Sequence, residues 1–187
     1  MQVQILSPYT LSFLNIGSEI FENILTPSDP RYHTEDYQEY LSSLESRLQQ
    51  LCHRHQKGHE SKIDRILFPQ AALIYFERMS KSCSGHSSKI DGWAESAFGI
   101  LSETRAVRHP FLLFLLGLEA RTDDRRIIIL QTIQQSSKTM NSKNIELLLG
   151  LLQSAWNQDD LTTNRDIPYD RKLDVIFSTY KSAPAFL

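Results

Sequence analysis

The sequence contains few cysteines, glycines and prolines, and each shortage excludes a class of protein. Its two cysteines, Cys52 and Cys83, form no CxxC pair and are too few to staple a small secreted domain. A reducing intracellular compartment is therefore expected. Glycine and proline occur seven times each. Because both residues interrupt helices, their scarcity favours a helical chain.

The sequence also lacks a strong charge of either sign. Its formal net charge is −2 at pH 7, so no overall basic excess indicates nucleic-acid binding. Local basic clusters are interspersed with acidic side chains, which favours solvated helix ends over a nucleic-acid surface. The basic residues of these clusters are Arg105, Arg108, Arg121, Arg125 and Arg126, and the acidic residues are Glu119, Asp123 and Asp124.

Long hydrophobic runs are missing as well. The most apolar segment, residues 111–118, has eight residues, whereas a membrane-spanning helix needs about 20. The first residues, MQVQILSPYTLSFLNIG, have no basic stretch ahead of the apolar ones, so no secretory signal is expected. We therefore expect neither a membrane segment nor a membrane partner.

What the sequence does contain is apolar residues at helical spacing. Tyr37, Leu41, Leu44, Leu48 and Leu51 recur every three or four positions, and strand-like alternation is nearly absent. A chain of 187 residues is long enough to bury a core. We predict an all-α fold, an irregular multi-helix bundle of about seven to nine helices that forms a single domain over residues 1–187.

Several positions are expected to begin, break or end these helices. We expect interruptions near Pro8 and Gly17, and a kink or break before Pro69. Thr34 is expected to cap a long helix that ends near Gly58. The stripes expected to face inward in the last two helices are Ile145, Leu148, Leu149, Leu152 and Trp156, and then Tyr169, Leu173, Ile176 and Phe177.

The segment HPFLLFLLGLEARTDDRRIIIL, residues 109–130, is expected to form a buried helical corner. Pro110 suits the first turn of a helix, where its missing N–H costs nothing. Gly117 lets a neighbouring helix come close because it has no side chain. Thr122 is expected to cap the next helix, with Asp123 and Asp124 at its positive end.

One group of residues is a candidate metal site. Cys52, His53, His55 and His59 are all of types that bind metal ions. However, Gly58 interrupts the helix, and His53 and His55 lie on different faces. A solvated basic helix end is therefore the favoured interpretation, and we expect no metal ligands.

Glu119 and the two tryptophans are the other candidates for chemistry. Glu119 follows the most apolar run, where a carboxyl group can act as an acid or base, but no nucleophile, phosphate loop or second carboxylate accompanies it. The structural alternative is an ion pair with a nearby arginine or a helix-end position near solvent. Trp93 and Trp156 lie at helical spacing, which favours core positions, although aromatic residues also line small-molecule pockets between helices. We expect no catalytic residue and no cofactor.

Several weak motifs, taken in order, resemble a known family. HPFLLFLLGLEARTDDRRIIIL is similar to the (W/H)PLF-x-x-G-C-E-A segment and the following Thr-Asp/Glu-x-x-Arg helix start of fungal-specific transcription factor regulatory domains. AALIYFERM upstream, and NIELLLGLLQSAWNQDDL and YDRKLDVIFSTYKSAPAFL downstream, continue the series in the family's order. The resemblance covers residues 71–187 well and residues 1–60 only loosely.

Two departures from the family pattern are visible. Leu118 stands where the family often has cysteine, and the position stays apolar. The family's domains are C-terminal regions of zinc-cluster (Zn2Cys6) regulators, whose cluster needs six closely spaced cysteines, and this sequence has two. The resemblance therefore implies the regulatory half without the DNA-binding module, either as a short free-standing relative or as a fragment of a longer regulator.

The resemblance implies a non-enzymatic regulator of transcription in the nucleus, for instance of a secondary-metabolite gene cluster. It implies protein partners, either a second copy or a full-length zinc-cluster regulator, a small-molecule effector, and no direct DNA contact. The alternative is a helical small-molecule-binding protein or a lyase-like enzyme of fungal secondary metabolism. Its only metal-binding motif would be TDDRR, whose Asp123 and Asp124 lie at a helix start rather than on facing helices.

Overall fold

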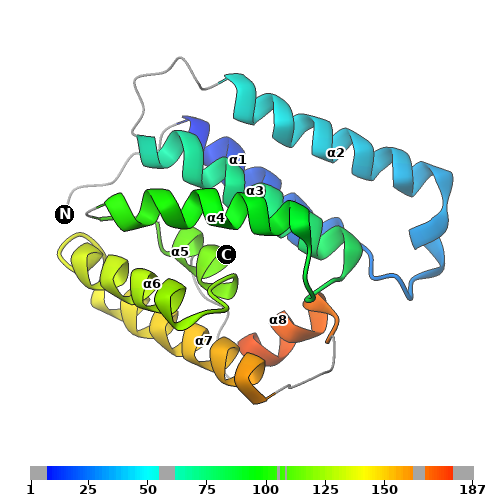
Figure 1. Ribbon diagram of the computed structural model, residues 1–187. Coiled ribbons are helices and arrows are strands. Elements are labelled where there is room, and N and C mark those ends of the chain that lie inside the picture. Colours follow the sequence, from blue (N-terminus) through cyan, green and yellow to red (C-terminus); the bar gives the residue numbers. More distant parts are fainter. Residues whose placement is uncertain (1–7, 55–61, 105, 108, 162–166, 179–187) are drawn as a thin grey trace. The chain divides into compact units, whose positions relative to one another are not determined.

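A computed structural model describes residues 8–54, 62–104, 106–107, 109–161 and 167–178. Within these residues the chain forms eight α-helices and one short 3-10 helix, and no strand (Figure 1). The all-α prediction is confirmed. The chain divides into two compact units, Met1–Ser82 and Cys83–Leu187, and each is described by itself.

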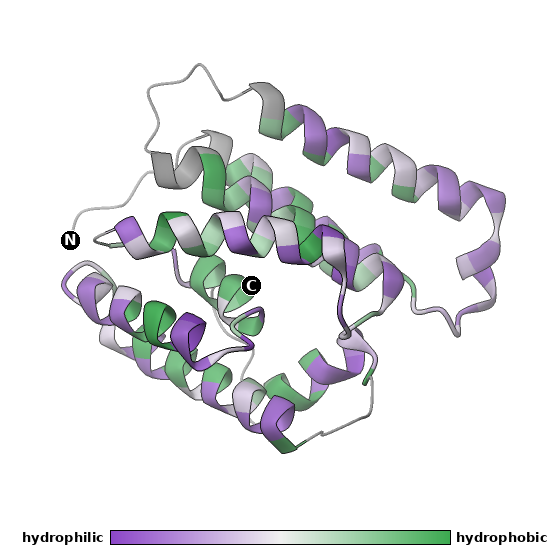
Figure 2. Ribbon diagram, in the orientation of Figure 1, coloured by the Kyte–Doolittle hydropathy of each residue, from purple (hydrophilic) through white to green (hydrophobic). Residues whose placement is uncertain are grey.

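The first unit consists of α1 (Pro8–Asn23), the 3-10 helix η1 (Pro30–His33), α2 (Glu35–Arg54) and α3 (Lys62–Lys81). Helix α3 packs against both α1 and α2. Helix α2 buries only one stripe, which is why most of its length is hydrophilic in Figure 2. The buried apolar residues of this unit include Phe13, Ile16, Ile20, Tyr37, Leu44, Leu48, Leu67, Phe68, Ile74 and Tyr75, and the polar residues Glu77, Arg78 and Ser80 of α3 are buried with them.

Neither Gly17 nor Pro69 ends a helix, although the sequence predicts an interruption near Gly17 and a kink or break before Pro69. Helix α1 begins at Pro8 and runs through Gly17, and α3 runs through Pro69. A proline inside a helix removes one backbone hydrogen bond. At Pro69 this loss is outweighed by burial, because Pro69 and its neighbours Leu67 and Phe68 all lie in the core.

Helix α2 begins directly after Thr34, as expected, but the Thr34 hydroxyl donates to the Arg31 carbonyl at 2.7 Å instead of capping the first turn of α2. Asp29 accepts a hydrogen bond from the Arg31 amide at 2.8 Å and so caps η1. Thr34 follows η1 and precedes α2, and its carbonyl accepts from the Gln38 amide at 3.1 Å. The expected end near Gly58 lies outside the described residues; α2 extends to Arg54.

We expect replacement of Glu19 by glutamine to weaken the pH dependence of the first unit. Glu19 on α1 accepts from both terminal nitrogens of Arg47 on α2, at 2.7 and 2.8 Å. This bidentate hydrogen bonding lowers the pKa of Glu19 below its ordinary 4.5. The pair therefore stabilises the fold above that value, and its contribution is lost as the pH falls through the lower folded pKa.

The expected loss in Glu19→Gln at pH 7 is below about 1 kcal/mol, because both side chains are partly exposed. Urea unfolding followed by circular dichroism between pH 7 and pH 2 measures it. The difference between wild type and variant should shrink to nothing at the acid end. A difference that stays constant over this range would contradict the assignment.

The second unit consists of α4 (Ser88–Glu103), α5 (Pro110–Leu118), α6 (Asp123–Ser136), α7 (Ser142–Leu161) and α8 (Tyr169–Ser178). Helix α5 contacts α6 and α7, α4 contacts α6, and α7 contacts α8. Every residue of α5 from Leu112 to Leu118 is buried, and its ribbon in Figure 2 is hydrophobic almost throughout. Helix α5 is thus the centre around which this unit packs.

The stripes expected to face inward are only partly right. Leu148, Leu152 and Trp156 are buried on α7, but Leu149 is exposed. On α8 the buried residues are Tyr169, Lys172, Leu173 and Ile176, with Phe177 half-buried. No helix in the described part of the chain is long and apolar enough to cross a membrane.

Candidate functional site

The corner between α5 and α6 forms as the sequence predicts. Pro110 is the first residue of α5, and Thr122 caps α6 by accepting a hydrogen bond from the Arg125 amide at 3.4 Å. A Cβ atom on Gly117 would lie 3.0 Å from Cδ1 of Leu152 on α7 and closer still to Cδ2. The missing side chain of Gly117 is therefore what admits Leu152 against α5.

A clamp of two side chains, Trp156 and Arg126, fixes this corner to α7. The indole Nε1 of Trp156 donates to the Gly117 carbonyl at 2.9 Å. The guanidinium of Arg126 lies over the Trp156 ring, 5.5 Å from its centroid, and its Nε donates to the Ala120 carbonyl at 3.2 Å. Its two terminal nitrogens bind both oxygens of Asp160, at 2.9 and 2.7 Å.

The guanidinium of Arg126 lowers the pKa of Asp160 by hydrogen bonding to it, and Asp160 in turn raises the pKa of Arg126. Both groups therefore stay charged across the physiological range. The pair closes the C-terminal end of α7 onto the first turn of α6.

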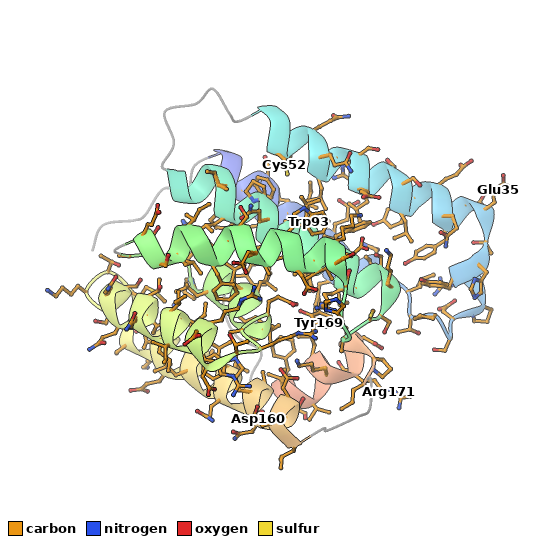
Figure 3. All side chains as sticks on the ribbon, in the orientation of Figure 1. Glu35, Cys52, Trp93, Asp160, Tyr169 and Arg171 are labelled. Carbon is orange, nitrogen blue, oxygen red and sulfur yellow. The ribbon has the colours of Figure 1, made fainter. Side chains whose placement is uncertain are left out.

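Next to this clamp lies a polar pocket of about 360 Å³. Its walls come from the loop before α4, the α5–α6 turn, the end of α7 and the beginning of α8. Figure 3 labels Asp160 on α7 and Tyr169 and Arg171 on α8, the two helices that bound it on one side. The residues that line it are Ser84, Gly85, His86, Arg121, Arg126, Gln158, Asp159, Asp160, Ile167 and Lys172.

Charged groups in the pocket are held by short contacts. Lys172 is buried, and its Nζ lies 2.6 Å from Oδ1 of Asp159. Arg121 donates through one terminal nitrogen to the carbonyls of Ser84 and Gly85, the latter at 3.2 Å. His86 contacts Asp91 through Nδ1 at 2.8 Å. The loop before α4 is thereby attached to the corner.

Sequence reasoning missed this pocket, and only part of it carries a signal. Lys172 sits three residues after Tyr169 and four before Ile176, on the inward face of α8. A lysine at such a position must be paired when it is buried, so its spacing predicts a carboxylate partner. The loop serines and glycine carry no comparable pattern.

Two findings from known proteins bear on the chain. The model of the fungal-specific transcription factor domain matches residues 12–175. The chain belongs to this family. Transcription factor iacI of Pestalotiopsis fici is 28% identical over 184 residues, which are 97% of this chain and 48% of the relative. The chain thus spans about half the length of that relative, and no solved structure matches it.

The family match contains the whole corner and both residues of the clamp. The resemblance inferred from the motifs is therefore confirmed, and the match begins at residue 12, within the segment that the motifs cover loosely. Leu118, at the position where the family often has cysteine, is buried in α5. A buried thiol behaves as a small apolar group, so leucine preserves the packing.

Glu119 lies at the end of α5, as expected from sequence, but it is not near solvent. Glu119 is buried, with only 3% of its surface exposed. Its amide donates to the Leu116 carbonyl at 3.0 Å and so closes the last turn of α5. Glu119 is thus an integral part of the corner.

The basic residues near the corner are engaged with the protein. Arg125 contacts Glu95 at 2.6 Å, and its guanidinium lies 4.9 Å from the Phe98 ring centroid. Asp123 and Asp124 are exposed in the first turn of α6, where the positive end of the helix dipole stabilises their negative charges. Arg105 and Arg108 lie outside the described residues.

The candidate metal ligands are only partly described. Cys52 is half-buried, and burial raises the pKa of its thiol to about 11. A thiol that stays protonated at neutral pH is a poor metal ligand. His55 and His59 lie outside the described residues, as does the side chain of His53. Across the residues that the structure describes, no three His, Cys, Asp or Glu side chains group as a metal site.

The two tryptophans differ in burial. Trp156 is 5% exposed and belongs to the core. Trp93 is half-buried on α4, and Lys89 lies over its ring at 5.2 Å from the centroid. A cation already stacks on the exposed side of Trp93, which matches a surface position with one packed face.

Proposed function

We propose that this chain is the regulatory part of a transcription regulator and acts in the nucleus through protein contacts, without catalytic activity. The observation that carries the proposal is the family match over residues 12–175. The match to half of a transcription factor supports it. The partner is a second copy of the chain or a full-length zinc-cluster regulator.

An apolar strip on α6 supports a role in association. Ile127 and Leu130 are 49% and 42% exposed, and they lie three positions apart on one face of the helix. Towards the C-terminal end their exposed neighbours on this face, Gln131 and Gln134, carry no charge, and the charged Asp123 and Asp124 lie at the N-terminal edge of the strip. Protein interfaces are depleted of charge at their centres, and this strip has that composition.

Self-association can be measured by sedimentation velocity on the chain. We expect the wild type to dimerise and the double variant Ile127→Glu, Leu130→Glu to be monomeric, because two desolvated carboxylates oppose an apolar interface. Val175→Glu is the matched control, since Val175 is 52% exposed on α8. This control should dimerise like the wild type.

A reporter gene distinguishes the partners. The chain is fused to an unrelated DNA-binding domain, and expression from the matching promoter is measured in a fungal host. A response that requires Ile127 and Leu130 in a chain that is monomeric when purified indicates a separate partner. A monomeric chain that leaves the reporter unchanged would overturn the proposal.

A further inference from the structure

We infer that the polar pocket of the second unit binds a small organic carboxylate, with Arg121 as the group that recognises it. The pocket is built wholly from residues of this unit. Its volume of about 360 Å³ falls in the range of ligand sites in proteins. The inference of binding is argued from the pocket alone, whereas the use of the bound ligand as a regulatory signal rests on the proposed function.

The charges of the pocket leave one cation available. Besides His86, which contacts Asp91, three basic side chains line it, and two of these are neutralised: Arg126 by Asp160 and Lys172 by Asp159. Arg121 forms no ion pair with any residue that the structure describes. Its bonds go from one terminal nitrogen to backbone carbonyls of the loop. The remaining nitrogens of its guanidinium are free to bind an anion.

The loop contributes a second polar group. The hydroxyl of Ser84 is shielded from solvent and has no hydrogen-bond partner among the described residues. A buried polar group without a partner destabilises the fold, and a ligand that pairs with it removes that penalty. Ser84 and Arg121 line the same cavity, and Arg121 holds the Ser84 carbonyl. Rotation of the Ser84 side chain would let this hydroxyl donate to a ligand oxygen bound to Arg121.

These groups favour a carboxylate over other small ligands. A planar guanidinium offers parallel donors that match the two oxygens of a carboxylate. The walls are largely polar, with Gln158, Asp159 and His86 facing the cavity beside a single aliphatic residue, Ile167. Because the lining is mostly polar and the volume is about 360 Å³, the occupant is hydrophilic and of metabolite size.

Isothermal titration calorimetry on the full chain tests the inference with succinate, L-glutamate, succinamide and inorganic phosphate as probes. We expect saturable binding of a carboxylate probe and none of succinamide, which has the same shape without charge. Binding of phosphate alone, or equal binding of succinamide, would overturn the assignment of a carboxylate site.

Variants separate recognition from folding. Arg121→Ala should weaken carboxylate binding at least tenfold, while Arg171→Ala, an exposed arginine on α8 (Figure 3), should leave it unchanged. Ser84→Ala removes an unpaired buried hydroxyl, so it should weaken binding severalfold while leaving the melting temperature unchanged or higher. A merely structural role for Ser84 would not produce these opposite effects. Equal binding by wild type, Arg121→Ala and Ser84→Ala overturns the inference.

The regulatory use has its own readout. The reporter fusion is measured in cells supplied with the carboxylate that binds in vitro, for the wild type and for Ser84→Ala. A response in the wild type that Ser84→Ala reduces supports an effector. Binding without any change in the reporter would uphold the site and overturn its role as an effector.

Discussion

Replacing Trp156 by alanine is expected to lower the free energy of unfolding of the second unit by about 3–5 kcal/mol. Trp156 is 5% exposed, donates to the Gly117 carbonyl, and carries the Arg126 guanidinium over its ring. The substitution removes a large buried ring and leaves a cavity beside α5. A loss of this size is a large share of the roughly 5–15 kcal/mol that stabilise a typical domain.

Tryptophan fluorescence during urea unfolding reports on the second unit, and so it measures this loss of stability. Both tryptophans of the chain, Trp93 and Trp156, lie in the unit Cys83–Leu187, so Trp93 reports the unfolding of the variant. Trp93→Ala is the matched control. Because Trp93 is only half-buried, its loss should lower stability by much less. Equal effects of the two substitutions would contradict the role of the clamp.

The milder change Trp156→Phe isolates the hydrogen bond. It keeps an aromatic ring under Arg126 but removes the Nε1 donor to Gly117. The Gly117 carbonyl also accepts from the Ala120 amide at 3.1 Å, so it retains a partner. The expected loss is about 1 kcal/mol from the bond, in addition to the smaller apolar area that phenylalanine buries.

The corner was predictable because its signals are local. Pro110 at a first turn and Thr122 before two acidic residues describe helix ends, whose hydrogen bonds involve neighbours in sequence. The absence of a side chain at Gly117 likewise predicts close packing without naming the partner. The sequence alone could not identify Leu152 as that partner, because the contact joins positions 35 residues apart.

Elsewhere the predictions failed where tertiary packing overrides local preference. Pro69 and Gly17 are helix breakers by propensity, yet both are buried within continuous helices. Leu149 belongs to the stripe expected to face inward, yet it is exposed. A leucine on a solvent face is common in folded proteins, and periodicity cannot distinguish it from a core leucine when apolar residues cover several faces of the helix.

The pocket was not predictable for a different reason. Its lining comes from four separate stretches of the chain, and its most informative property, a guanidinium without a carboxylate partner, is defined by what lies around Arg121. In the sequence Arg121 stands next to acidic residues and resembles any surface arginine. In the folded chain Asp160 pairs with Arg126 and Asp159 pairs with Lys172. This pairing leaves Arg121 without a carboxylate partner among the described residues, so that it can bind an anion.

Replacing Gly117 by alanine is expected to destabilise the second unit by up to about 2 kcal/mol, although alanine is the better helix former. Alanine gains roughly 1 kcal/mol of helix propensity in a helix interior. Its methyl group, however, would lie 3.0 Å from one terminal carbon of Leu152 and closer to the other. Leu152 is fully buried, so it must move against packed neighbours, and such overpacking typically costs about 1–3 kcal/mol.

Gly99→Ala is the matched control, and its change in the free energy of unfolding should be opposite in sign to that of Gly117→Ala. Gly99 lies inside α4, and a Cβ atom there would meet nothing within 4 Å. Alanine at this position should therefore stabilise the same unit by about 0.5–1 kcal/mol. Urea unfolding followed by tryptophan fluorescence measures both variants. Stabilisation by both substitutions would show that Leu152 yields without cost.

A double-mutant cycle tests whether the contact with Leu152 is what makes Gly117→Ala destabilising. Leu152→Ala alone should cost about 2–5 kcal/mol, because it opens a cavity next to α5. In the Leu152→Ala background the methyl group of Gly117→Ala no longer meets the leucine side chain, so the second substitution should become neutral or stabilising. The two changes are then non-additive by about 1 kcal/mol or more. Additive losses would mean that the added methyl group meets the backbone of α7 and not the side chain of Leu152. The need for glycine at position 117 would then have another cause.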